Sequence, residues 1–329
     1  MRDGGRDMGN KGDDKGRILL SITDWDPDMW RAEFAKAAPG RPIVLQPDHP
    51  GDETIHYALV WKQKPGSLAN LPNLKAIFSL GAGVDHIFHD PHIPDVPIVR
   101  IVSDDLSMRM SEYVVWQVLD HHRLGPRYRR QQQNRIWHED RRQPAANEVT
   151  VGILGLGVLG RDAAAKLLAL GFRVTGWSRR PHETEGVETF HGKEGFGDFL
   201  AGADIIVCLL PLTPETKGIL SMSMFARLKQ EGPLGAPVLI NAGRGGLQNE
   251  ADILAALDRG LLSAAVLDVF QKEPLPADSP LWTHPKVTVT PHAAASSAPG
   301  AIVPLIVQHI EAYERGEPLT NVVDRATQY

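Results

Sequence analysis

The sequence predicts an α/β protein with two domains, each built on a doubly wound parallel sheet, and three observations carry this prediction. The chain has 329 residues, a length that suggests about two domains. Short apolar segments of strand length alternate with helix-like segments, which is typical of parallel sheets covered on both faces. A glycine-rich turn between an apolar strand and a helix lies near the middle of the chain, so one domain is expected to be inserted into the other.

The first half of the chain supplies three predicted strands and two predicted helices. The strands are short apolar runs bounded by Pro, Gly or Asn, and the second helix has a long amphipathic pattern. The predicted strands are residues 17–23, 57–61 and 74–80, and the predicted helices are residues 26–38 and 108–122.

The second half is more regular and supplies six predicted strands, the number that a doubly wound dinucleotide-binding sheet needs. These strands are residues 149–154, 173–177, 204–210, 237–241, 264–269 and 287–290. Helices are predicted between them at residues 161–170, 196–201 and 250–259, and a last helix at residues 299–315. Both domains are therefore expected to be Rossmann-like.

Composition and charge exclude several classes of protein. No apolar run approaches the ~18 residues of a membrane span, and the net charge of −5 argues against a nucleic-acid partner. Residues 1–16 are polar and glycine-rich and lack the apolar core of a signal peptide, so we expect a disordered tail. The single cysteine, Cys208, lies in an apolar run and fits a reducing compartment, which predicts a cytoplasmic protein.

The mid-chain glycine loop has the G-x-G-x-x-G pattern at Gly155, Gly157 and Gly160. It follows an apolar strand and opens a helix, which is the context in which this pattern binds a dinucleotide. The first glycine permits the tight turn, the second lets the pyrophosphate approach, and the third lets the helix pack against the strand. The loop backbone, including Val158 and Leu159, is expected to contact the cofactor.

The residues after the second strand of this domain indicate which cofactor is used. NAD-binding domains carry an acidic residue about 20 residues past the loop, where it holds the ribose hydroxyls. Here the strand is followed by Ser178, Arg179 and Arg180, with no carboxylate. A hydroxyl and guanidinium groups can bind a ribose 2′-phosphate, so NADP(H) is favoured over NAD(H).

Three later segments supply groups for hydride-transfer chemistry. Arg244, Glu273 and His292 each lie where the chain leaves a predicted strand, the edge at which an open α/β sheet binds its ligand. A guanidinium can hold a carboxylate and polarise a neighbouring carbonyl. An imidazolium can donate a proton to the oxygen of a carbonyl that accepts hydride, and a carboxylate on its other nitrogen fixes the tautomer.

With these motifs in order, the chain resembles the D-isomer-specific 2-hydroxyacid dehydrogenases, and within them the glyoxylate/hydroxypyruvate reductase branch, from about residue 17 onward. The resemblance implies that Arg244 is the catalytic arginine, His292 the acid/base and Glu273 the residue that orients it. It further implies cofactor contacts from Asp268, at the nicotinamide amide, and from two residues that follow strands, Pro211 and Ala242.

The segment from residue 79 to residue 85 resembles the family's substrate loop, in which backbone N–H groups bind the substrate carboxylate. Gly81, Ala82 and Gly83 are therefore expected to bind substrate, and glycine allows a close backbone approach. Trp61 is expected either to line this pocket or to belong to the apolar core.

The resemblance implies a substrate domain of residues 17–113 and 293–329 and a dinucleotide-binding domain of residues 114–292. It implies NADPH-dependent reduction of a small 2-keto acid, glyoxylate or hydroxypyruvate, by a homodimer. Another 2-hydroxyacid specificity, such as phenylpyruvate or a longer keto acid, stays open. So does a nucleotide-sensing binding protein on the same scaffold, as the family's corepressors are, although the intact catalytic set argues against it.

Two clusters of polar residues have simple alternatives to a functional role. His86, His89 and His92 have a spacing that suggests a metal, but prolines interrupt the segment, so we predict a loop of solvated histidines and no metal site. An arginine cluster precedes the glycine loop and is either a solvated helix face, a subunit contact or an anion-attracting rim. It comprises Arg123, Arg127, Arg129, Arg130, Arg135, Arg141 and Arg142.

Overall fold

The computed structural model describes residues 15–45 and 51–329, so the tail expected over residues 1–16 lies almost wholly outside the described part. The chain divides into two compact units. The first comprises Met1–Ile101 and Pro299–Asp324, and the second comprises Val102–Ala298 and Arg325–Tyr329. One unit is thus inserted into the other, and each is described by itself.

The first unit is a five-stranded parallel sheet with strand order β2-β1-β3-β4-β5. Three of its strands confirm those predicted at residues 17–23, 57–61 and 74–80. The other two, β2 and β5, were not predicted, because segments of three and two residues are too short to show a strand pattern. The strands are β1 (Arg17–Ile22), β2 (Ile43–Leu45), β3 (Ile55–Trp61), β4 (Ala76–Ser79) and β5 (Ile98–Val99).

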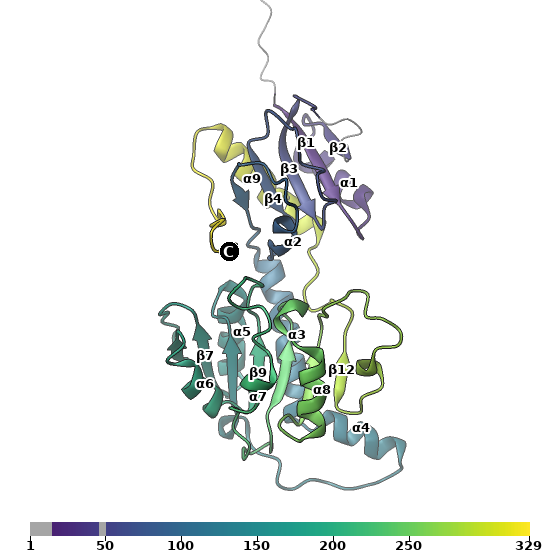
Figure 1. The fold of residues 1–329 in the computed structure, drawn as a ribbon, viewed down its shortest axis with the longest axis vertical. Coiled ribbons are helices and arrows are strands. Elements are labelled where there is room, and N and C mark those ends of the chain that lie inside the picture. The colour runs from purple at the N-terminus through teal and green to yellow at the C-terminus, as the bar shows by residue number, and fades with distance from the viewer. Residues whose placement is uncertain (1–14, 46–50) are drawn as a thin grey trace, which may run out of the picture. The chain divides into compact units, whose positions relative to one another are not determined.

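Both faces of the first sheet are covered, as the continuously apolar strands require. On one face, α1 (Pro27–Ala37) packs beside α9 (Pro299–Glu314), two helices from opposite ends of the sequence (Figure 1). Trp30 and Phe34 of α1 belong to the same buried cluster as Ile306 of α9. On the other face, residues of the loops and of the short helix α2 (Asp85–Phe88) complete a second cluster.

The second unit is a seven-stranded parallel sheet with strand order β12-β11-β10-β9-β6-β7-β8. All neighbouring strands are parallel, and the order reverses between β6 and β9, which makes a topological switch point there. The strands are β6 (Thr150–Leu154), β7 (Arg173–Ser178), β8 (Glu188–His191), β9 (Ile205–Cys208), β10 (Val238–Asn241), β11 (Ala264–Leu267) and β12 (Val287–Val289).

The helices of the second unit cover both faces of this sheet and position its loops. They are α3 (Asp104–His122), α4 (Gly125–Gln133), α5 (Val158–Ala169), α6 (Phe196–Gly202), α7 (Met222–Phe225) and α8 (Glu250–Asp258), with single 3₁₀ turns at Ala146–Glu148, Gly245–Leu247 and Pro280–Trp282. None of the helices in residues 15–45 and 51–329 combines the length and the apolar composition that crossing a bilayer requires.

The whole of α3 belongs to the second unit, so the domain boundary expected after Tyr113 falls inside a helix. The apolar face of α3 explains this. Met110, Tyr113, Val114 and Val118 pack in one buried cluster with residues of β6 and α5. An amphipathic pattern shows that a helix has an apolar face, but it does not show which sheet that face covers.

Candidate active site

The glycine loop joins β6 to α5 and has the backbone geometry that its sequence requires. Gly155 has φ +105°, a conformation that favours glycine, and its N–H donates to Trp177 O at 2.9 Å. A Cβ on Gly160 would lie 1.9 Å from Gly155 O, so only glycine lets α5 begin this close to the loop. Val158 and Leu159 form the first turn of α5, whose N-terminal N–H groups suit a phosphate.

Tyr329 also lies at this loop, which the sequence did not indicate. A Cβ on Gly157 would be 3.3 Å from the Tyr329 hydroxyl oxygen. Residues 325–329 belong by their contacts to the second unit, although residues 299–324 belong to the first. Contacts between segments that are far apart in sequence leave no pattern along the chain, so no motif could have revealed this one.

The segment expected to bind a 2′-phosphate begins where β7 ends. Ser178 is half-buried and donates through Oγ to Arg180 O at 2.6 Å, and Arg179 and Arg180 are exposed. Glu215 lies near enough to Arg179 to be affected by its charge. The pKa of the Glu215 carboxyl is lowered by hydrogen bonds from its own backbone and from Thr213, and the Arg179 guanidinium adds to this lowering.

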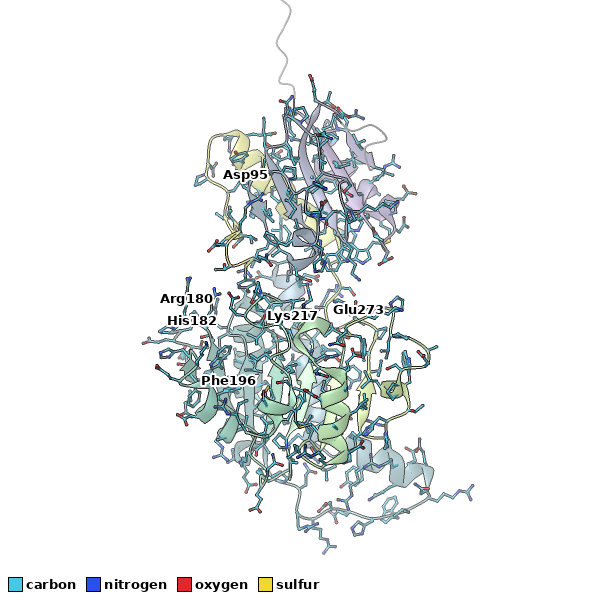
Figure 2. All side chains as sticks on the ribbon, in the orientation of Figure 1. Asp95, Arg180, His182, Phe196, Lys217 and Glu273 are labelled. Atoms are coloured by element: carbon cyan, nitrogen blue, oxygen red, sulfur yellow. The ribbon has the colours of Figure 1, made fainter. Side chains whose placement is uncertain are left out.

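Two further basic side chains lie beside this segment and were missed by the sequence analysis. Arg161, in the first turn of α5, donates through Nη1 to Leu156 O at 3.0 Å and lies 2.7 Å from Nε2 of His182. Arg180 and His182 are both labelled in Figure 2 on the same side of the second unit. Arg161 therefore contacts both the glycine loop, at Leu156, and the segment after β7, at His182.

Pro211 and Ala242 follow the neighbouring strands β9 and β10. Pro211 O accepts from Thr216 Oγ1 at 2.6 Å, which fixes the turn after β9. Ala242 is buried, and its N–H donates to Cys208 O at 3.2 Å, so it continues the pairing of β10 with β9. Both residues stand at the carboxyl edge of the sheet, the edge at which open α/β sheets bind ligands.

Arg244 leaves β10 through a tightly constrained turn. Its Nη1 donates to Gly243 O at 2.9 Å, and Arg244 O accepts from Asn241 Nδ2 at 3.2 Å. Asn241 is fully buried and also donates to Gln248 Oε1 at 2.8 Å. A Cβ on Gly245 would lie 1.8 Å from Phe270 O. The glycines and Asn241 of this motif thus position the backbone that carries Arg244.

His292 and Glu273 are brought into direct contact. His292 Nδ1 lies 2.8 Å from Glu273 Oε2, and the other carboxylate oxygen accepts from Phe270 N at 3.2 Å. Both side chains are partly exposed, at 30% and 23%. With the carboxylate accepting from Nδ1–H, the second ring nitrogen, Nε2, is the atom left to exchange a proton.

The backbone of His292 is held in an uncommon conformation. Its φ is +53°, and its N–H donates to Asp268 O at 2.8 Å and to Thr290 O at 3.0 Å. A non-glycine residue in the left-handed region carries a cost that the surrounding structure must offset. Such residues cluster at functional sites, which fits the role that the sequence assigned to His292.

Asp268 explains how this conformation is held. Its buried carboxylate accepts from Thr290 Oγ1 at 2.6 Å and from the N–H groups of Ala293 at 2.9 Å and Ala294 at 3.0 Å. Tyr113 of α3 lies with its hydroxyl 2.7 Å from Thr290 Oγ1. Asp268, predicted as a cofactor contact, therefore holds both sides of His292, and Tyr113 and Thr290 join it from remote positions in the sequence.

The predicted substrate loop lies in the first unit, at the carboxyl end of β4. Ser79 Oγ donates to Gly83 O at 2.8 Å and accepts from Gly81 N at 3.4 Å. Gly81 is buried, and a Cβ there would lie 2.4 Å from Trp61 Cζ3. Ala82 and Gly83 are half-buried. The indole of Trp61 therefore packs directly on the loop.

The three clustered histidines do not form one solvated loop. His89 and His92 are exposed as expected, but His86 is 9% exposed and lies on α2, which begins at Asp85. That part of the prediction was wrong, because the aromatic ring of Trp61 and polar partners from β3 and β4 surround His86.

Ion pairs satisfy much of the arginine cluster around α4. Arg129 donates to both carboxylate oxygens of Asp120, at 2.8 and 2.7 Å, and Arg127 pairs with Asp140. Arg141 and Arg142 are exposed and lie near Glu139 and Asp140. The pairs on Asp120 and Asp140 favour the structural interpretations of this cluster over an anion-attracting rim.

Known proteins resemble the chain over nearly its whole length. Residues 115–294 match the model of the D-isomer specific 2-hydroxyacid dehydrogenase NAD binding domain. The glyoxylate/hydroxypyruvate reductase A of Yersinia enterocolitica is 42% identical over 278 residues, covering 82% of this chain and 86% of the relative. That of Serratia proteamaculans is 41% identical over 317 residues, covering 93% and 98%.

Solved structures agree with the sequence relatives. The NADPH-dependent glyoxylate/hydroxypyruvate reductase of Sinorhizobium meliloti, in complex with NADP and sulfate, superposes with a TM-score of 0.91 at 47% identity, covering 96% of this chain and 100% of that one. A D-isomer specific 2-hydroxyacid dehydrogenase of Xanthobacter autotrophicus, in complex with NADPH and MES, gives a TM-score of 0.90 at 40% identity, covering 95% and 99%.

Proposed function

The chain belongs to the D-isomer-specific 2-hydroxyacid dehydrogenase family, and from this premise we propose that it reduces glyoxylate or hydroxypyruvate to the 2-hydroxy acid with NADPH. The observation that carries the proposal is the contact of His292 Nδ1 with Glu273 Oε2, at the edge of a sheet that also bears the glycine loop. A dinucleotide-binding loop alone specifies no reaction, whereas an acid/base pair at the same edge does.

The described residues fit a bound NADP(H). Gly155 and Gly160 shape a turn that leaves no room for a Cβ at either position, and the start of α5 presents N–H groups to a pyrophosphate. Ser178, Arg179 and Arg180 are proposed to hold the 2′-phosphate. NADPH, when bound, supplies the hydride. Further proposed cofactor contacts come from the carboxyl edge of the sheet, at Gly157, Val158, Leu159, Pro211, Ala242 and Asp268.

Proton transfer is proposed to take place at His292 Nε2. Glu273 holds the ring through Nδ1, so that Nε2–H can donate to the oxygen of the carbonyl being reduced. In the reverse direction the neutral ring accepts the proton at the same atom. The Asp268 carboxylate accepts hydrogen bonds from Thr290 Oγ1 and from the N–H groups of Ala293 and Ala294, which hold the chain on both sides of His292.

The substrate is proposed to be held by its carboxylate. Arg244 provides a guanidinium, which binds a carboxylate through two hydrogen bonds and polarises the adjacent carbonyl. Backbone N–H groups of Gly81, Ala82 and Gly83, on the loop after β4, are proposed to bind a substrate carboxylate, with Trp61 packed beside them.

The proposal is tested by assaying one panel of keto acids with NADPH and with NADH. We expect the highest kcat/KM for glyoxylate or hydroxypyruvate with NADPH. A higher kcat/KM for phenylpyruvate or longer keto acids would replace this specificity with the other one that the sequence leaves open. Tight NADPH binding without oxidation by any keto acid would instead indicate a nucleotide-sensing protein.

The working protein is further proposed to be a cytoplasmic homodimer. Trp137 is 102% exposed and Ile136 is 54% exposed, in the segment that follows α4. Large apolar side chains at the surface mark interaction sites, and aromatic residues and arginine are enriched in them. Cys208 is a buried free thiol, as a reducing compartment allows.

A further inference from the structure

His86 is buried, and a network of hydrogen bonds connects it through Ser79 to the predicted substrate loop. Its Nε2 is 3.2 Å from Ser79 Oγ, and Ser79 is fully buried at the end of β4. Its Nδ1 accepts from Lys62 N at 3.3 Å and lies 3.1 Å from Gln63 Oε1. Lys62 and Gln63 directly follow β3. The ring thus joins the ends of two neighbouring strands.

The direction of each hydrogen bond follows from the donors. Because Lys62 N–H donates to Nδ1, a neutral ring carries its proton on Nε2 and donates it to Ser79 Oγ. Ser79 then donates its single hydroxyl proton to Gly83 O at 2.8 Å and accepts from Gly81 N. Gln63 Oε1 lies 3.1 Å from the same Nδ1, so the Gln63 side chain packs against the ring from the end of β3. The chain of donors therefore runs from β3 through His86 to the loop.

His86 also supports the aromatic side of the loop. Its ring packs edge-on against Trp61, with centroids 4.9 Å apart and an interplanar angle of 63°. Trp61 in turn stacks on Trp25 with centroids 4.7 Å apart and covers Gly81. One buried side chain thus contacts both Ser79, which ties the two ends of the loop together, and Trp61, which covers the loop.

We propose that His86 is a positioning residue for substrate binding, acting through Ser79 and Trp61 on the N–H groups of residues 81–83. The inference rests on the proposed function, because it assumes that this loop binds the substrate carboxylate. Backbone donors discriminate between ligands only when their geometry is fixed beforehand, since ordering a loop on binding reduces affinity. In this proposal His86 fixes the loop geometry through its contacts with Ser79 and Trp61, and it does not itself contact the substrate.

A buried histidine that merely fills space would behave differently. Its removal would lower the free energy of unfolding and would affect substrate binding and turnover without selectivity. A positioning role predicts a selective rise in KM for the keto acid. It also predicts rescue by a residue that can still donate to Ser79, because the amide nitrogen of glutamine can take the place of Nε2 whereas leucine offers no donor.

The test compares His86→Leu, His86→Gln and Ser79→Ala with the unmutated enzyme, and uses His89→Ala as the matched control, because His89 is exposed three residues away. We expect His86→Leu and Ser79→Ala to raise KM for glyoxylate by about tenfold, the effect of one or two hydrogen bonds. His86→Gln is expected to stay within about threefold of the unmutated enzyme, and kcat and the Kd for NADPH are expected to change little in all variants. His89→Ala is expected to match the unmutated enzyme.

Binding of oxalate, an unreactive two-carbon dicarboxylate, is measured by calorimetry in parallel with NADP present, and its Kd is expected to follow KM. An unchanged KM in both His86→Leu and Ser79→Ala would overturn the inference, and so would equal losses in His86→Gln and His86→Leu. The proposed function is judged separately, by whether the unmutated enzyme reduces the keto acid. Ser79→Ala removes only a hydroxyl, so it keeps the inference falsifiable if His86→Leu does not fold.

Discussion

The proposed selectivity for NADPH rests on the residues after β7, where Arg179 is exposed. Arg179→Ala is expected to lower kcat/KM for NADPH by about 10- to 100-fold, the effect of one charge-assisted hydrogen-bonding group, while kcat/KM for NADH changes little. Steady-state kinetics with both cofactors measure this. Arg173→Ala is the control, because Arg173 lies at the other end of the same strand and donates to Glu148 O. Equal losses with both cofactors would contradict the assignment.

The contact of Glu273 with His292 can also be tested by changing one residue. Glu273→Gln keeps the size of the side chain and a hydrogen-bond acceptor but removes the negative charge beside His292 Nδ1. We expect kcat to fall by about 10²-fold, within the range that acid–base groups contribute. The Kd for NADPH, measured by fluorescence titration, should not change. A kcat close to that of the unmutated enzyme would show that the carboxylate does not assist proton transfer.

At the scale of elements, the junction of β6 with α5 depends on Gly160. A Cβ there would lie 1.9 Å from Gly155 O, so Gly160→Ala must push the helix away from the loop. We expect a loss of several kcal/mol in the free energy of unfolding, in the upper range for single substitutions. Urea denaturation measures it.

The control for this variant is Gly202→Ala at the end of α6, where a Cβ would meet no atom within 4 Å. This substitution is expected to be neutral or to stabilise by about 0.5–1 kcal/mol, because glycine loses more backbone freedom on folding than alanine does. If the two variants unfolded at the same urea concentration, the packing account of the third glycine would be wrong.

The elements show how far the sequence predicts this fold. Buried parallel strands such as β9 and β10 were predictable, because their runs of three or four successive apolar residues are typical of strands buried on both faces. The edge strand β8 (Glu188–His191) was not, since it has one apolar residue, Phe190, and both of its end residues are exposed. The same limit applied to β2 and β5, which are too short to show alternation.

The site likewise contains residues that the sequence predicts and residues that it does not. Arg244, Glu273 and His292 could be proposed because each stands in a short local motif after a strand. Tyr113 could not, because its hydroxyl reaches Thr290 across 177 residues of sequence. The burial of His86 was missed for a similar reason, since its partners Ser79, Gln63 and Trp61 come from the ends of two other strands. Hydrogen-bond networks between strands depend on the fold and not on spacing along the chain.

At the scale of the whole molecule, the proposed dimer predicts a change in mass with one substitution. The unmutated protein should sediment at about twice the 36.1 kDa of the chain. Trp137→Asp should sediment as a single chain or as a concentration-dependent mixture, because a charge in a desolvated apolar contact is costly. Met29→Asp, at another exposed apolar side chain, is the control. A single-chain mass for the unmutated protein would refute the dimer.

In the proposed reduction of a keto acid with NADPH, the proton is transferred at His292. The most direct measurement is kcat of His292→Ala with glyoxylate and NADPH, together with the Kd for NADPH. We predict that kcat falls by about 10²- to 10⁴-fold, the contribution of general acid–base catalysis, while the Kd stays within a factor of about two. A kcat near that of the unmutated enzyme, at unchanged Kd, would contradict proton transfer at His292.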